Sequence, residues 1–170
     1  VNFFDTNFKN TILKSSDMIC EDSINIKNSS GIINKIQIDN SYFDALDLDF
    51  SKIKINDLKV NNAKNDCIDF SFGEYEIINA NLKNCGDKGL SVGERSKLNM
   101  HNGVIMYSNI GIASKDDAIT NVKNVAMNNM NICLAAYNKK KEFKGSKLNI
   151  KSLNCNQYNT CLLYTSDAAD

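Results

Sequence analysis

The 170-residue sequence contains no proline, no tryptophan, one arginine (Arg95) and one histidine (His101). Neither charge is in excess, because 20 Lys and Arg residues balance 20 Asp and Glu residues. A protein that binds nucleic acid by neutralising phosphates needs a basic excess, so this balance argues against a nucleic-acid partner. No apolar run approaches the roughly 18 residues of a membrane-spanning helix, so the sequence predicts no membrane span.

The cysteines form no C-x-x-C pair, which argues against a zinc or redox site. We interpret five of them as buried small apolar residues and leave disulfides between them open. These five are Cys20, Cys67, Cys85, Cys133 and Cys155. The sixth lies in residues 161–170, which resemble a translated sequencing adapter; we interpret this segment as a non-native tail. The chain starts at Val1 without a signal-peptide pattern, so we expect it to be part of a longer multidomain protein.

One spacing dominates the sequence, because the chain repeats itself every 22 residues. The clearest column of equivalent positions is Ile24, Leu46, Ile68, Leu90, Ile112 and Leu134. The column before it holds small residues, namely Ser23, Ala45, Cys67, Gly89, Gly111 and Cys133. A second apolar column is predicted at Ile38, Val60, Leu82, Val104 and Ala126, and a turn column at Asn40, Asn62, Asn84, Met106 and Asn128.

Within each repeat, short stretches of alternating apolar and polar residues are separated by Asn, Gly, Asp and Ser, which is typical of strands joined by turns. About 22 residues with two or three short strands suit one coil of a parallel β-solenoid. We therefore predict an all-β fold, a right-handed parallel β-helix of roughly six coils over residues 16–160. Residues 1–15 are expected to be a worn coil or a connection to a missing N-terminal part. The hexapeptide period of a left-handed β-helix and the leucine spacing of a leucine-rich repeat are both missing.

The coil length and the asparagine column resemble right-handed parallel β-helix proteins of the pectate-lyase type. Three segments are also similar to uncharacterised β-helix domains of large bacterial surface or secreted proteins: DALDLDFS (44–51), GDKGLSVGE (86–94) and GIASKD (111–116). The resemblance implies an extracellular or cell-surface location and a polysaccharide partner. The N-T-D, G-H-G and R-x-K patterns of polygalacturonase-like enzymes are missing, and we expect Arg95 and His101 to lie in turns.

The outward-facing columns bring carboxylates together. One column is Asn25, Asp47, Asp69, Ser91, Ala113 and Ala135, and the next is Lys27, Asp49, Ser71, Gly93, Lys115 and Tyr137. Asp47 and Asp69 should lie about 5 Å apart, with Asp49 on the same face. Three carboxylates this close repel one another, so either a pKa rises or a cation lies among them.

Two kinds of chemistry follow from this face. Carboxylate oxygens suit Ca²⁺, which makes Asp47, Asp49 and Asp69 candidate metal ligands. Paired carboxylates also suit glycoside hydrolysis, so Asp47, Asp69 and Lys115 are candidate catalytic residues. Candidate substrate-binding residues are Asp49, Tyr137 and Lys139, the last in a charged loop inserted at 138–145, where Phe143 can also stack on a sugar ring. The competing interpretation is structural, because Asp at strand starts often accepts bonds from backbone N–H groups.

Two functions remain. The leading hypothesis is a module of a secreted or cell-surface protein that binds glycan or acts as a rigid scaffold, without a catalytic signature. The alternative is a polysaccharide-modifying enzyme, a lyase, glycoside hydrolase or epimerase acting on acidic polysaccharide; fold alone does not decide between them.

Overall fold

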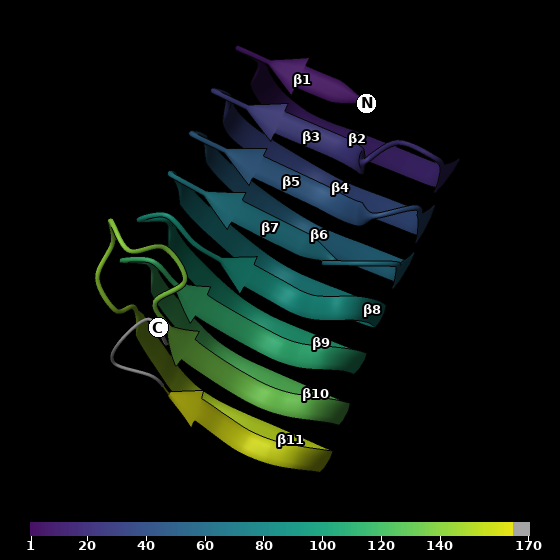
Figure 1. Ribbon diagram of the computed structural model, residues 1–170. Helices are drawn as coiled ribbons and strands as arrows, with labels where there is room; N and C mark the ends of the chain where they lie inside the picture. Colours follow the sequence, from purple (N-terminus) through teal and green to yellow (C-terminus); the bar gives the residue numbers. More distant parts are fainter. Residues whose placement is uncertain (165–170) are drawn as a thin grey trace.

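The strands form one parallel stack in a computed structural model that describes residues 1–164 (Figure 1). The strands are β1 (Asn2–Phe4), β2 (Asn7–Met18), β3 (Asp22–Lys27), β4 (Ser30–Ser41), β5 (Asp44–Asp49), β6 (Lys52–Ala63), β7 (Ile68–Ser71), β8 (Glu74–Val92), β9 (Lys97–Lys115), β10 (Ile119–Tyr137) and β11 (Lys147–Tyr164). Each strand pairs in parallel with its equivalent in the neighbouring coil. The prediction of an all-β solenoid of about six turns with coils of about 22 residues is confirmed. The described residues include no helix that could cross a membrane.

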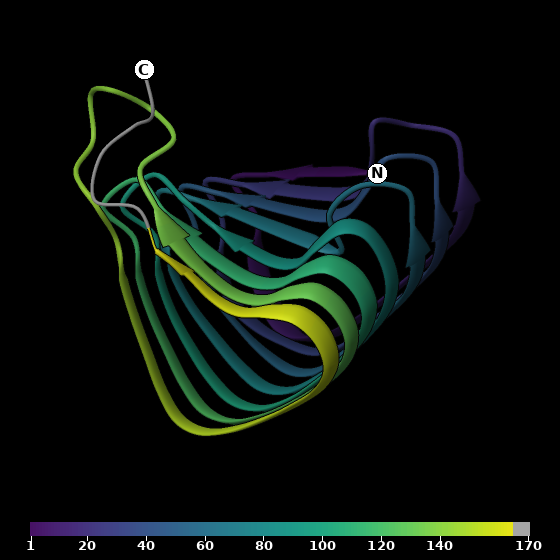
Figure 2. The same ribbon diagram turned by 60° about the horizontal axis from the view of Figure 1, so that its bottom comes forward.

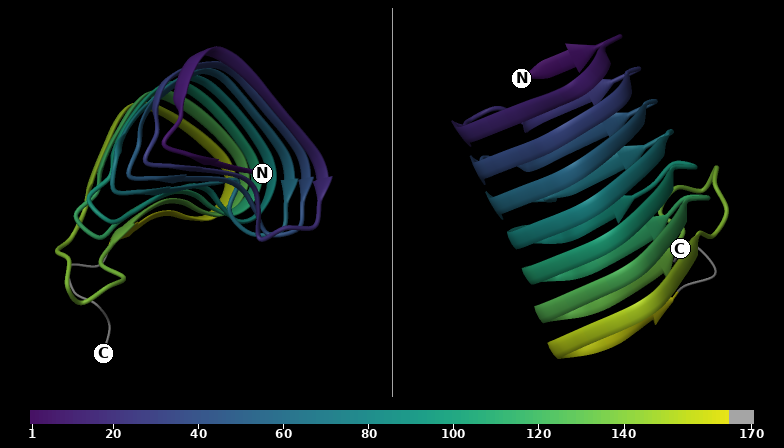
Figure 3. Two further views of the ribbon diagram at one scale, coloured as in Figure 1. Left: turned by 90° about the horizontal axis from the view of Figure 1, so that it is seen from above. Right: turned by 180° about the vertical axis from the view of Figure 1, so that it is seen from behind.

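The core is a set of side-chain ladders inside the coils. Leu46 pairs in register with Ile68, and Ile68 with Leu90, and all three are fully buried. Stacking at the strand spacing of about 4.8 Å explains why one column accepts only isoleucine and leucine, because each side chain packs against its own equivalent. Seen from above, the coils share one bent outline and are displaced stepwise from one another, and from behind the strands run side by side (Figure 3).

The predicted asparagine ladder exists at one corner. The Asn84 side-chain amide donates to the Asn62 Oδ1 at 2.7 Å, and the Asn62 amide donates to the Asn40 Oδ1 at 2.8 Å. All three have positive φ, between 55° and 63°, a conformation that Asn tolerates better than most residues. The ladder therefore supports both the turn and the contact between coils.

The second apolar column and the turn column are predicted wrongly in the later coils. The buried positions are Ile105 and Met127 in place of Val104 and Ala126, and the turn positions are Tyr107 and Asn129 in place of Met106 and Asn128. The turn between β8 and β9 contains one additional residue, so Glu74 pairs with Lys97, 23 positions on. A one-residue shift moves every side chain to the other face of a strand, which explains the error. The bulge between Cys85 and Lys88 restores the 22-residue step.

Two disulfides resolve the question that the sequence left open. Cys67 is bonded to Cys85 across one coil. Cys133 is bonded to Cys155, which lies 22 residues further along the chain, in the last coil. Cys20 is exposed and free, so its prediction as a buried residue is wrong. Two coils before the first bridge, the Ser23 hydroxyl donates to the Ser41 Oγ at 2.8 Å, in the same two columns and at the same separation of 18 residues.

The predicted inserted loop lies between β10 and β11 and projects from one corner of the stack (Figure 2). It lengthens the coil step to 28 residues, from Ile119 to Lys147. The last strand runs to Tyr164, so residues 161–164 of the predicted non-native tail continue β11. Residues 165–170 lie outside the described part of the chain.

Candidate functional site

The candidate site is the outward face of the short strands β3, β5 and β7, together with the ends of β8 to β10. We call its carboxylates the acidic strip: Asp22, Asp44, Asp47, Asp49 and Asp69. Alternation places Ile24 and Ile26 inside and Asn25 outside, and the same pattern repeats in the next two coils. Asn25 pairs in register with Asp47, and Asp47 with Asp69, as the 22-residue spacing predicts.

Asp47 is the most perturbed of these groups. Partial burial and the neighbouring carboxylates, Asp49 and Asp22 first, raise its pKa from 3.8 to about 8. The Asn25 amide donates to the Asp47 Oδ2 at 2.7 Å. Burial also raises the pKa of Asp49, although the Lys27 ammonium, 3.7 Å away, opposes this shift. The repulsion expected from the sequence is therefore present, and it favours the protonated form of Asp47.

Lys115 reaches this face from a later coil. It is 4 % exposed, and its ammonium donates to the Ser91 Oγ at 2.8 Å and lies 3.7 Å from the Asp69 Oδ1. Its chain lies across Gly93, where an added Cβ would come within 2.8 Å of the Lys115 Cε. Gly93 therefore makes the space that lets Lys115 reach back two coils.

Tyr137 follows Lys115 in the same column and is half-buried. It packs against Ala113 and Ala135, so its ring covers the small residues of the last coils. Burial raises the pKa of its hydroxyl, and the nearby Lys115 ammonium works against this shift.

The aspartates at the strand starts have the structural role that the competing interpretation gives them. The Asp44 Oδ1 accepts the backbone N–H of Asp66 at 2.8 Å, and the Asp66 Oδ1 accepts that of Lys88 at 2.9 Å. Asp66 is buried, and burial raises its pKa to about 6 despite the Lys88 ammonium. These bonds hold one coil on the next, so Asp44 and Asp66 stabilise the fold.

An aromatic ladder borders the acidic strip, and of its three rings only Phe143 was predicted from the sequence. Phe50 and Phe72 stack with ring centroids 4.7 Å apart and planes 6° apart, and Phe143 of the inserted loop lies 6.2 Å from Phe72. Phe50 is 52 % exposed. The available signal was that Phe50 and Phe72 are 22 residues apart, directly after the Asp49 and Ser71 positions.

The inserted loop is fastened beside this ladder. The buried Asp116 accepts the backbone N–H groups of Lys139 and Lys140 at 2.7 and 2.9 Å. The Lys140 ammonium lies 2.6 Å from Glu94, and although burial disfavours the Glu94 charge, this partner and Ser71 lower its pKa. The Lys139 side chain is exposed, and its backbone N–H bond to Asp116 links it to the site.

Within residues 1–164, no group of three or more His, Cys, Asp and Glu side chains is placed to hold a metal ion. The calcium ligand set Asp47, Asp49 and Asp69 stays a prediction.

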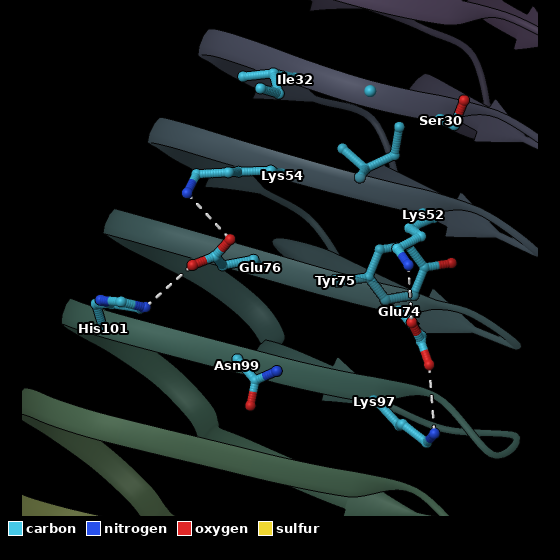
Figure 4. A pocket seen from close by; sticks show the side chains of 12 residues that line it. Ser30, Ile32, Lys52, Lys54, Glu74, Tyr75, Glu76, Lys97, Asn99 and His101 are labelled. Atoms are coloured by element: carbon cyan, nitrogen blue, oxygen red, sulfur yellow. Dashed lines mark hydrogen bonds and ion pairs between the residues drawn. The ribbon is translucent and has the colours of Figure 1, made fainter.

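A groove of about 720 Å³ lies over β4, β6, β8 and β9, away from the short strands of the acidic strip (Figure 4). Glu74 lies between Lys52 and Lys97, at 3.5 and 3.3 Å. Glu76 lies between Lys54 and His101, at 3.1 and 3.2 Å. His101 is thus in β9, not in a turn, whereas Arg95 is in a turn as predicted. Three lysines and two glutamates line the groove, and both glutamates are paired with lysine, so only one positive charge is left over for a ligand.

Comparison with protein-family models, with curated proteins and with solved structures gave no match for this chain.

Proposed function

We propose that this chain is a glycan-binding β-helix module of a secreted or cell-surface protein, and that the acidic strip with its aromatic ladder is the binding face. The observation that supports this most is the Phe50–Phe72 stack, in which Phe50 is exposed, on the same face as the Asp47 and Asp69 carboxyls. Aromatic faces pack against the apolar side of a sugar ring, while carboxyl and amide groups bond its hydroxyls. The phenylalanine and the aspartate each occur in two successive coils, so the face runs along the stack axis, which suits a linear polymer.

The charge of the acidic strip restricts which sugars can bind. Two lysines of the Asp49 column lie close to its five carboxyls, Lys27 at 3.7 Å from Asp49 and Lys115 at 3.7 Å from Asp69. Because the raised pKa of Asp47 favours its neutral form and two lysines offset other carboxylates, the face suits neutral sugars or amino sugars, whose hydroxyl and amino groups the carboxyls can bond. The two disulfides support a location outside the cytosol, because such bonds persist in oxidising compartments. The pectate-lyase-type resemblance belongs to this proposal as well.

The test is a glycan array followed by titration calorimetry on the glycans that bind. Phe50→Ala/Phe72→Ala and Asp47→Asn/Asp69→Asn should each weaken binding at least about tenfold, which corresponds to about 1.4 kcal/mol. The first matched control is Tyr42→Ala, which removes a similarly exposed ring from the turn between β4 and β5.

A second matched control, Asp39→Asn/Asp57→Asn, removes two charges from the β4–β6 sheet. Both controls should leave affinity unchanged. If the array shows no binding, or if the control variants lose as much affinity as the site variants, the binding face is wrong and a rigid scaffold becomes the better function.

One observation favours an enzyme as the second candidate. Asp47 lies in register with Asp69, and burial with the neighbouring carboxylates raises its pKa to about 8, the direction that a general acid requires. This hypothesis predicts that the wild-type chain releases reducing or unsaturated ends from polysaccharides, and that Asp69→Asn or Lys115→Met abolishes the release. No turnover on panels of neutral, amino-sugar and uronic-acid polymers would reject it.

A further inference from the structure

One amine and one carboxyl meet on the acidic face without a hydrogen bond between them. Lys115 belongs to β9 and Asp69 to β7, so the pair reaches across β8, which lies between these strands. The Lys115 side chain is 5 % exposed, and its ammonium lies 3.7 Å from the Asp69 Oδ1, beyond hydrogen-bond distance. Within residues 1–164, that buried oxygen accepts no hydrogen bond. A buried ion pair with an unsatisfied oxygen is costly, because both ions have given up their hydration.

The neighbouring residues hold the amine in this position. The Lys115 ammonium donates to the Ser91 Oγ at 2.8 Å, and the fully buried Ser91 is in register with Asp69. Gly93 leaves the space that the lysine chain crosses, since an added Cβ would come within 2.8 Å of the Lys115 Cε. The Lys115 side chain is therefore held along one path, and this path ends beside the Asp69 carboxyl.

A second half-buried lysine shows an ordinary ion pair in the same stack. The Lys88 ammonium lies 3.4 Å from the Asp66 Oδ1 and also pairs with Asp87. The Asp66 Oδ1 accepts the backbone N–H of Lys88 at 2.9 Å as well. Hydrogen bonds of this kind stabilise a carboxylate as an ion, and the Asp69 Oδ1 has none.

We propose that Lys115 and Asp69 join in an intramolecular amide bond, which the folded chain forms by itself and which cross-links β9 to β7. The Lys115 ammonium first passes one proton to the Asp69 carboxylate, so that a neutral amine faces a carboxylic acid. The Nζ atom then attacks Cγ, and the Nζ–Cγ bond forms. The bond between Cγ and the hydroxyl oxygen breaks, and this hydroxyl leaves as water with a proton from the nitrogen. The ammonium and the carboxylate supply every atom of the amide and the water, so no co-reactant is needed.

The position of the two groups favours this condensation, which bulk water opposes. Groups held in a reacting geometry behave as if their concentration were about 10⁵–10⁸ M. The product is a neutral amide, so its formation removes two charges whose burial is costly. The Asp69 side chain is 28 % exposed, so the water that leaves has a route to solvent.

The bond has different consequences for the two candidate functions. An amide at Asp69 still bonds sugar hydroxyls, so the glycan-binding face is retained. The enzyme candidate needs a free Asp69 carboxyl, so the cross-link and that candidate exclude each other.

The intact mass of the full 170-residue chain, measured after its disulfides are reduced and its thiols alkylated, tests the proposal. The wild type should be lighter than its sequence mass by one water molecule. Lys115→Met, which keeps the buried chain but removes the amine, and Asp69→Ala should both have their full sequence masses. Lys88→Met is the matched control, because it removes the other half-buried lysine, and it should keep the loss of one water. Circular dichroism melting of each variant shows that it is folded before it is scored.

Peptide mapping of the wild type locates the bond without any variant. Trypsin cuts after lysine and arginine but not after a lysine whose amine is part of an amide. The digest should therefore contain one species that joins residues 65–83 to residues 98–123, and its fragmentation should place the link at Asp69 and Lys115. A wild type with its full sequence mass, a water loss that Lys115→Met retains, or cleavage after Lys115 into separate peptides would overturn the proposal.

Discussion

An engineered disulfide at Ala45 and Ala63 tests the stacked-coil geometry directly. These two residues occupy the columns of Cys67 and Cys85 one coil earlier, since Ala63 pairs in register with Cys85 and the Ala45 N–H bonds the carbonyl of Asp66. Both alanines are buried, and the native bridge in the next coil joins Cα atoms 5.2 Å apart, within the usual range for a disulfide. Ala45→Cys/Ala63→Cys should therefore form a third bridge.

The expected gain follows from the length of the closed loop. The new bridge spans 18 residues, like that of Cys67 and Cys85, and loss of unfolded-chain entropy for such a loop is worth about 3 kcal/mol at 25 °C. For a domain of this size, that corresponds to a rise in melting temperature of about 6–12 °C. Strain from the added sulfur atoms would lower the gain but not prevent the bond.

The assay counts free thiols in denaturant and then measures thermal unfolding, in a parent with Cys20→Ser and Cys161→Ser. The double variant should show no free thiol and a raised melting temperature. Ala45→Cys/Lys64→Cys is the control, because a shift of one residue turns the second sulfur outward and should leave both thiols free. Two free thiols in the first variant, or a bridge in the control, would refute the register of these coils.

Three further outcomes are expected. The pKa of Asp47 is about 8 in the folded chain and 3.8 in the unfolded chain, so the wild type should lose stability as the pH rises from about 4 to 8. Asp47→Asn should remove this loss and be about 1–3 kcal/mol more stable than the wild type at pH 9, measured by urea unfolding. This range is well below the full pKa shift because solvent reaches the carboxyl. Equal pH profiles would contradict this. Asn62→Ala should cost about 2 kcal/mol, and Asn62→Gly about 1, because glycine accepts the positive φ but neither can replace the ladder bonds; equal losses would show that the backbone conformation is unimportant. Gly31→Ala places a Cβ 2.1 Å from the Phe8 carbonyl oxygen at φ 117°, so limited proteolysis should cut the first coil from an otherwise intact chain, whereas Gly145→Ala, which meets nothing within 4 Å, should not change the digest.

The candidate site could be predicted in part. The 22-residue period placed Asp47 beside Asp69 and Asp49 on their face, because residues one coil apart must be neighbours in a parallel stack. It also placed Lys115 and Tyr137 in one column. It could not show that Lys115 would be buried across Gly93, since that depends on the path of a long side chain over two coils.

The sequence by itself determined the period, the inward columns and the acidic neighbours, because side-chain alternation and a fixed coil length act locally and repeat. Only the tertiary structure decided the 23-residue step at Glu74 and Lys97, which depends on how one turn packs against its neighbours. The disulfides also needed it, because Cys67 and Cys85 belong to different columns that meet across the interior of a coil. The raised pKa of Asp47 was also decided by the tertiary structure, because it depends on burial and on charges brought together from several strands.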